Sequence, residues 1–185
     1  IAPDALQAEG TEFFDLRPVT ELTVSGLRNR YRHPGIGSPV AARSRALPGH
    51  TPVVVLDEND LVPLTAVVEI EKPLAGLRSG HLQGEFEVFG SLDSLAFESN
   101  DGRTIALESE PSAALAASLA ESRFWQKELQ IFLGNAIGLR RESSLHGVRP
   151  YLRGRIPIVF VHGTASSSAR WADMINDLLA DSRLR

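Results

Sequence analysis

The sequence of 185 residues contains no cysteine, and it has only one methionine, two tryptophans and two tyrosines. Without cysteine the chain can form no disulfide, no thiolate nucleophile and no cysteine-based zinc site. This absence is compatible with both the cytoplasm and the periplasm, so it fixes no compartment. No apolar run reaches the length of about 18 residues that a membrane-spanning helix needs. We therefore expect no transmembrane segment.

The chain also lacks any strong bias of charge. Its 19 basic and 23 acidic residues are interleaved, with a formal net charge of −4, and no basic stripe favours nucleic acid as a partner. Hydrophobic residues make up 43% of the chain, which is enough for a folded core. The scattered histidines show no helical i, i+4 spacing typical of metal ligands; these are His33, His50, His81 and His146. We expect neither a metal site nor a cofactor.

Residues 1–50 are expected to be an irregular segment with short strands at 12–16 and 20–24. Two prolines and two glycines within residues 34–39 interrupt regular structure. This interruption indicates a surface loop, or a tight turn packed against a neighbouring domain. Arginines make the segment locally basic: Arg28, Arg30, Arg32, Arg43 and Arg45. Contacts with nearby carboxylates on a solvated face explain them better than a ligand site does.

Residues 51–110 are expected to form an antiparallel β-rich domain. The apolar and β-branched runs predict strands at 51–56, 64–70, 81–89, 94–98 and 103–107. Asn100-Asp101-Gly102 predicts a hairpin between the last two. Two of these strands carry glutamates at alternate positions, at Glu69/Glu71 and Glu85/Glu87. Glu108/Glu110 would share a strand face in the same way if the last strand continues that far. A solvated sheet edge explains such pairs better than glycosidase chemistry, which would need a cleft.

Residues 111–148 are expected to form an amphipathic helix followed by an arginine-rich linker. Pro111-Ser112 is typical of a helix start, and Gly134 of an end. Apolar side chains recur every three to four residues, at Leu115, Leu119, Phe124, Leu129, Phe132 and Leu133. Packing of this face against the sheet is favoured over a lid or a membrane contact.

Residues 149–185 show the most informative pattern, a strand, a glycine turn and a helix. The continuous apolar run 158–161 is typical of a strand buried on both faces of a parallel sheet. His162-Gly163 follows where the backbone must turn sharply, and Ser166, Ser167 and Ser168 are candidates to cap the next helix. Asp173 lies near the positive end of that helix dipole. One face of the helix is expected to point at a sheet, through Trp171, Ile175, Leu178 and Leu179.

Residues 149–151 (Arg-Pro-Tyr) and 155–167 (RIPIVFVHGTASS) resemble a group of large bacterial α/β-hydrolases that carry a β-rich N-terminal region. The specific resemblance covers residues 149–185, and residues 1–148 agree in their arrangement, with 35–39 (GIGSP) as a weak supporting match. It implies that the Thr164 backbone N–H donates to the oxyanion, that His162 orients the loop and that Gly163 permits close approach. His162 is then not the catalytic base, because the triad of this fold follows in the order Ser, acid, His.

The expected fold class is therefore α/β with a β-rich N-terminal region. A small antiparallel β domain and one amphipathic helix precede the start of an α/β-hydrolase fold, namely its first core strand, oxyanion turn and helix. The 185 residues contain no Gly-x-Ser-x-Gly, so the resemblance places the nucleophile and the rest of the triad beyond Arg185. Residues 149–185 would then be a truncated core, and we expect the 185 residues alone to be inactive.

The resemblance implies a serine-type hydrolase acting on carboxylic esters, esterase-like or lipase-like, with an ester or lipid-like small molecule as substrate. Its other partner would be the remaining C-terminal hydrolase core, in cis or as a separate chain. The resembling group favours the bacterial cell envelope or periplasm over the cytoplasm. Two alternatives stay open. One is a non-catalytic β-rich binding or assembly module that docks to another polypeptide, and the other is a soluble domain whose His-Gly turn is coincidental.

Overall fold

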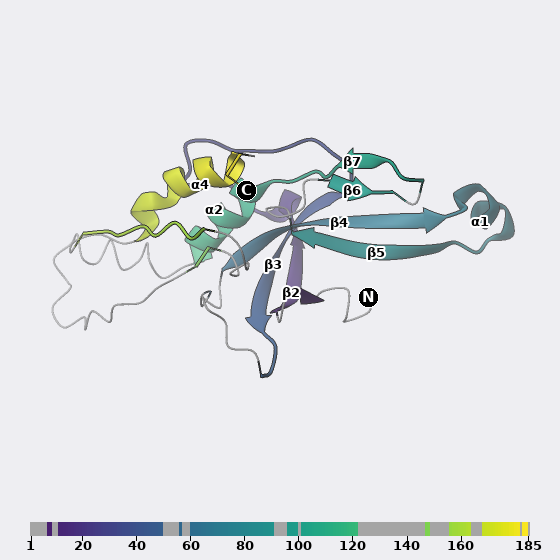
Figure 1. The fold of residues 1–185 in the computed structure, drawn as a ribbon, viewed down its shortest axis with the longest axis horizontal. Helices are drawn as coiled ribbons and strands as arrows, with labels where there is room; N and C mark the ends of the chain where they lie inside the picture. The colour runs from purple at the N-terminus through teal and green to yellow at the C-terminus, as the bar shows by residue number, and fades with distance from the viewer. Residues whose placement is uncertain are drawn as a thin grey trace.

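In the computed structural model, the residues described are 7–8, 11–49, 56, 60–90, 96–99, 101–121, 147–148, 156–163, 168–181 and 183–184. These residues form a mixed α/β fold with a five-stranded antiparallel sheet, a two-stranded sheet and three α-helices (Figure 1). The antiparallel, β-rich character expected from the sequence is confirmed. A parallel hydrolase core is not among the described elements.

The larger sheet has its strands in chain order, β1-β2-β3-β4-β5. The strands are β1 (Gln7–Ala8), β2 (Thr11–Pro18), β3 (Ser38–Ala46), β4 (Leu61–Glu71) and β5 (Gln83–Gly90). The predictions at 12–16, 64–70 and 81–89 fall on β2, β4 and β5 and are confirmed. The prediction at 51–56 lies almost wholly outside the described residues.

The first 50 residues differ from the expectation in two ways. The strand predicted at 20–24 is wrong, because the chain turns there through a short 3-10 helix, η2 (Val19–Glu21), and continues without a strand. The strand β3 was not predicted, although its residues Val40, Ala41 and Ala42 are buried between β2 and β4. The interruption predicted at 34–39 overlaps the start of this strand, since Ser38 and Pro39 already pair with Ala66 and Thr65 of β4.

The smaller sheet is a hairpin of β6 (Ala96–Glu98) and β7 (Thr104–Ala106). Its turn is closed by Ser99 N–H donating to Arg103 O over 2.9 Å, and Gly102 adopts a positive φ of 79° there. The hairpin prediction is thus confirmed. Phe97 packs edge-on against Phe89 of β5, with ring centroids 5.8 Å apart, so the hairpin covers one face of the larger sheet.

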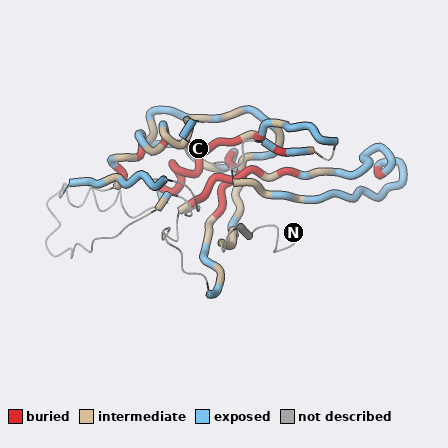
Figure 2. The backbone as a smooth tube through the Cα atoms, viewed as in Figure 1, coloured by how far each residue is buried: buried red, intermediate tan, exposed pale blue. Residues whose placement is uncertain are grey.

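The helix α2 (Pro111–Glu121) begins at the predicted proline. It is buried from Pro111 to Ser118, so it is not amphipathic over this stretch: it lies between the sheet and a second helix, and both flanks are covered (Figure 2). Leu61 N–H of β4 donates to Ser118 Oγ over 2.7 Å, which fixes the helix against the strand. Packing against the sheet is therefore confirmed, while the predicted end at Gly134 lies outside the described residues.

The C-terminal part contains η3 (Ser168–Trp171) and α4 (Ala172–Ala180). Ser168 does not cap α4, because it begins the 3-10 turn and Trp171 occupies the N-cap position, while the other two predicted capping residues, Ser166 and Ser167, lie outside the described residues. The predicted face is half-buried, at Trp171, Ile175, Leu178 and Leu179, but its predicted packing against a sheet is wrong. Ala172 and Asn176 are the buried residues of α4, which packs on α2 rather than on a sheet.

Candidate functional site

The turn predicted to carry chemistry lies at the end of an exposed segment, residues 156–163. None of these residues is in a helix or strand, and Ile156 and Val161 are 92% and 79% exposed. A strand buried on both faces needs a neighbour on each side, and the described residues place none beside this segment. The core strand expected at 158–161 is therefore not formed by the residues described here.

His162 and Gly163 are both exposed, and they contact each other locally. His162 Nδ1 lies 3.1 Å from Gly163 O, which fixes the orientation of the imidazole ring. A Cβ built on Gly163 would meet no atom within 4 Å, so the space above this glycine is open. Thr164, the predicted oxyanion donor, lies outside the described residues.

The exposed segment nevertheless folds back towards the C-terminal helices. The rings of Phe160 and Trp171 are stacked at a tilt of 39°, with centroids 5.6 Å apart. This contact joins the apolar segment to η3, which leads directly into α4. The Trp171 indole N–H is buried and has no hydrogen-bond acceptor among the described residues. The apolar segment therefore contacts the start of the C-terminal helices, although its described residues pair with no strand.

Residues 28–33, which we call the strap, hold α4 in place. Arg28 donates to the Asp173 carboxylate through its backbone N–H (2.8 Å) and its Nε (2.9 Å). The backbone bond is the largest reason why the pKa of Asp173 is lowered. Asp173 lies in the first turn of α4, as the sequence predicted, so the helix dipole and the strap both favour its charged form.

The strap also reaches the centre of the α2–α4 interface, at Asn176. Tyr31 N–H donates to Ser112 Oγ over 2.7 Å, and Ser112 Oγ–H donates to Asn176 Oδ1 over 2.8 Å. Asn176 Nδ2 in turn donates to Asn29 O over 2.8 Å. Asn176 is 1% exposed, and both ends of its amide are satisfied. This buried relay connects three segments that are far apart in the sequence.

The arginines of the first 50 residues are paired with carboxylates, as the sequence predicted. Arg30 binds Glu110 and Arg32 binds Glu108, both on the chain leading into α2. Arg45 binds Glu12 on the neighbouring strand over 2.7 Å. With Arg28 and Arg43 also paired, these side chains hold elements of the fold together, and their charges are already neutralised by protein groups.

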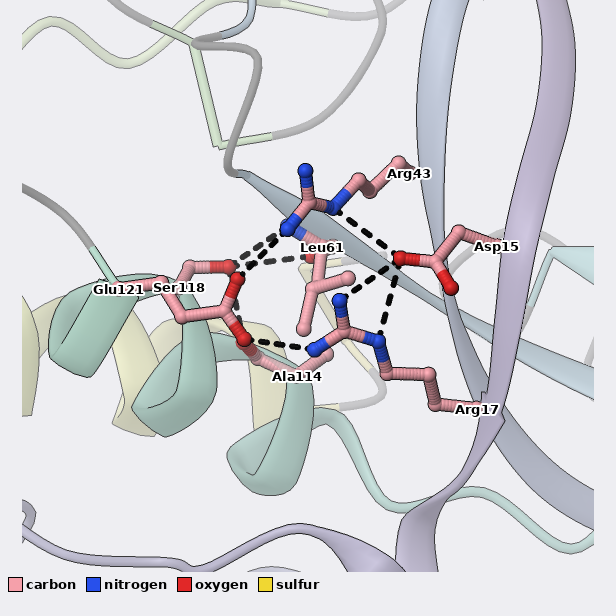
Figure 3. A network of polar contacts seen from close by, with 7 residues as sticks. All are labelled: Asp15, Arg17, Arg43, Leu61, Ala114, Ser118 and Glu121. Atoms are coloured by element: carbon pink, nitrogen blue, oxygen red, sulfur yellow. Dashed lines mark hydrogen bonds and ion pairs between the residues drawn. The ribbon is translucent and has the colours of Figure 1, made fainter.

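Arg43 belongs to a cluster of two arginines and two carboxylates, shown in Figure 3. Arg17 lies between Asp15 and Glu121, at 2.7 Å from each, and Arg43 donates to Glu121 over 2.9 Å. The hydrogen bond from Arg17 is the main reason why the pKa of Asp15 is lowered. Asp15 has a positive φ of 52° where the register of β2 shifts, a conformation that few residues other than glycine, asparagine and aspartate adopt. The cluster fixes the end of α2 against β2 and β3.

The paired glutamates of β4 and β5 lie on one face of these two strands, beyond the last residue of β4 that pairs with β3. Glu69 is the Cα partner of Glu85, and Glu71, Glu85 and Glu87 are exposed. For these two pairs the arrangement agrees with the solvated sheet expected from the sequence. The same expectation is wrong for Glu110, which is buried and binds Arg30. Over the described ranges, no three histidine or acidic side chains come close enough together to hold a metal ion.

The Tyr31 hydroxyl gives a direct test of the strap. It donates to Asp177 Oδ1 over 2.7 Å, and this bond to a carboxylate is the largest cause of the raised pKa of Tyr31. Because the folded-state pKa is raised, the bond contributes stability below the ordinary tyrosine pKa of about 10, and that contribution is lost as the pH rises through the folded pKa. An ultraviolet titration of tyrosinate should show one tyrosine ionising late.

The sequence has two tyrosines, so Tyr31→Phe identifies the signal. Asp177→Asn removes the negative charge, which should lower the pKa of Tyr31, so that Tyr31 ionises at a lower pH than in the original chain. If the late phase stays in Asp177→Asn, or never appears in the original chain, the strap does not hold Tyr31 as described.

The strap and its relay to Asn176 were not predicted from the sequence.

No helix in the described part of the chain is both long and apolar enough to cross a membrane. Comparison of the chain with protein-family models, curated proteins and solved structures found no match.

Proposed function

We propose that this chain supplies the first oxyanion turn of a serine-type α/β-hydrolase that acts on carboxylic esters. The observation that carries the proposal is the exposed apolar segment 156–161, which ends at His162-Gly163 and folds back on η3 through Phe160 and Trp171. Exposed apolar side chains in a row are typical of a surface that pairs with something else. Strands of a hydrolase core, in cis or on a separate chain, would cover it.

In this proposal the chemistry is acyl transfer. A serine of the added core attacks the ester carbonyl and passes its proton to a histidine held by an acid, and the carbonyl oxygen becomes negative. The Thr164 backbone N–H donates to that oxygen. His162 orients the turn, and the open space above Gly163 admits the ester. Collapse expels the alcohol with the proton from the histidine, and water then hydrolyses the acyl-serine.

The experiment that tests the function is fluorophosphonate labelling of the intact protein, followed by peptide mass spectrometry. The proposal expects a labelled serine in a Gly-x-Ser-x-Gly sequence, which these 185 residues do not contain. A label on Ser166, Ser167 or Ser168 would contradict it, and so would the absence of any labelled serine in a preparation that hydrolyses esters.

The role of Thr164 has its own test. Thr164→Pro removes the N–H, and we expect ester hydrolysis to fall by about 10² to 10³ in kcat, as for loss of an oxyanion donor in other hydrolases. Thr164→Ala keeps the N–H and is the matched control, with kcat close to that of the original protein. Full turnover in Thr164→Pro would show that the donor lies elsewhere.

A second candidate function is a non-catalytic binding module within residues 1–148. The observation in its favour is the hairpin of β4 and β5, which extends away from the core (Figures 1 and 2). This hairpin carries exposed apolar residues, among them Val68 and Ile70. Absence of both labelling and ester hydrolysis would favour this module over the enzyme.

A further inference from the structure

The β4–β5 hairpin continues beyond the sheet as an arm, which we define as residues 67–87. β3 pairs with β4 only as far as Ala66, whereas β4 and β5 remain paired from Val67↔Glu87 to Glu71↔Gln83. At about 3.4 Å per residue, these five pairs extend about 17 Å from the edge of β3. Figure 1 shows the arm leading away from the helices, with α1 (Pro73–Ser79) at its far end.

The tip of the arm, residues 72–82, presents leucine side chains to solvent. Leu74, Leu77 and Leu82 are 72%, 67% and 53% exposed. Their backbone is nevertheless ordered by hydrogen bonds, because Gly76 N–H donates to Lys72 O and His81 N–H donates to Gly76 O, both over 3.0 Å. The leucines therefore lie on a formed turn and not on a frayed end.

Charge is segregated along the arm. Residues 72–84 contain Lys72, Arg78 and His81 but no aspartate or glutamate, although the whole chain has a net charge of −4. Four glutamates follow directly behind the tip, on one face of the strands, at Glu69, Glu71, Glu85 and Glu87. The opposite face of the same strands carries Val68 and Ile70, which are also exposed. The tip is thus apolar and cationic, and its stem is acidic on one side.

We propose that the tip of the arm binds the surface of an anionic phospholipid bilayer. A protruding apolar turn fits the boundary between headgroups and acyl chains, where binding scales with buried apolar area and with attraction to anionic lipids. Lys72 and Arg78 complement the phosphate groups, while the glutamates of the stem are repelled and limit contact to the tip. The proposal does not depend on the proposed esterase function.

Co-sedimentation of the full chain with vesicles tests the proposal. We expect binding to phosphatidylcholine vesicles containing about a quarter phosphatidylglycerol, and weak binding to phosphatidylcholine alone. Each basic residue near such a surface contributes about fivefold, so Lys72→Gln with Arg78→Gln should weaken binding about 25-fold. Leu74→Ser with Leu77→Ser should weaken it by at least about tenfold.

Met174→Ser is the matched control, because Met174 is an exposed apolar residue on α4, away from the tip. It should bind like the original chain, and circular dichroism should show all variants folded.

In Leu77→Trp, brominated lipids should quench the fluorescence of the indole introduced at position 77. Equal binding to neutral and anionic vesicles, unchanged binding of the tip variants, or a dimer that the tip variants dissociate would each overturn the proposal.

Discussion

Replacing Gly35 with alanine should lower the free energy of unfolding by more than about 4 kcal/mol. A Cβ at this position would lie 2.3 Å from the Leu107 carbonyl carbon and 2.4 Å from both Ala106 O and Glu108 N. All three atoms belong to the backbone, so no rotamer change can relieve the clash. Urea denaturation followed by circular dichroism measures the effect.

The clash would also break the contact that the glycine permits. Next to Gly35, Ile36 N–H donates to Ala106 O and Glu108 N–H donates to Ile36 O, both over 2.8 Å. These bonds join the segment before β3 to the end of β7 and to the chain that follows it. Separating the two backbones would therefore expose buried hydrogen-bonding groups in addition to the steric cost.

Gly163→Ala is the matched control for this prediction. A Cβ there meets nothing within 4 Å, so the same change should alter the free energy of unfolding by less than about 1 kcal/mol. Equal stabilities of Gly35→Ala and Gly163→Ala would show that the segment at Gly35 does not approach the chain at Leu107 as closely as described.

The strands that could be predicted from the sequence have patterns which are local and apolar. β4 contains a run of aliphatic residues, and the hairpin of β6 and β7 has a turn sequence that specifies its own backbone conformation. β3 lacked such a signal, because Arg43 and Arg45 in SPVAARSRA resemble a polar surface segment. Those arginines belong in a strand because Glu121 and Glu12, distant in sequence, neutralise them.

In the C-terminal segment the opposite happens: the sequence has a strand pattern, but the described residues form no strand there. Its apolar residues have the local pattern of a buried strand, yet burial requires neighbouring strands, and the described residues place none beside 156–163. A sequence pattern reports what a segment can pair with. It does not supply the neighbouring strands, so the roles of His162 and Gly163 in an oxyanion turn are proposed and not observed.

The packing of α4 was beyond local prediction for a related reason. Apolar spacing indicated that Ile175 and Leu178 would be central, yet Asn176 occupies the buried position. A buried asparagine is favourable only when both ends of its amide are paired. Its partners, Ser112 and the Asn29 carbonyl, are 64 and 147 residues away, and no pattern within the helix reveals them.

Replacing Asn176 with alanine should therefore lower the free energy of unfolding by about 3 kcal/mol. The change leaves a cavity between α2 and α4 and removes the acceptor for Ser112 Oγ–H and the donor to Asn29 O. Asn29→Ala is the matched control, because its side chain bonds only at the exposed surface, to Tyr31 and Asp177, while its carbonyl is kept. We expect a loss below about 0.5 kcal/mol there.

A double-mutant cycle separates the relay from the cavity. Ser112→Ala also breaks the relay, so its cost should be smaller when Asn176 has already been replaced, with a coupling energy of about 1 kcal/mol or more. Additive losses would mean that the two side chains do not share a hydrogen bond. If Asn176→Ala costs no more than Asn29→Ala, α4 is not held at its buried amide, and the strap would then join α4 only through the exposed pairs at Asp173 and Asp177.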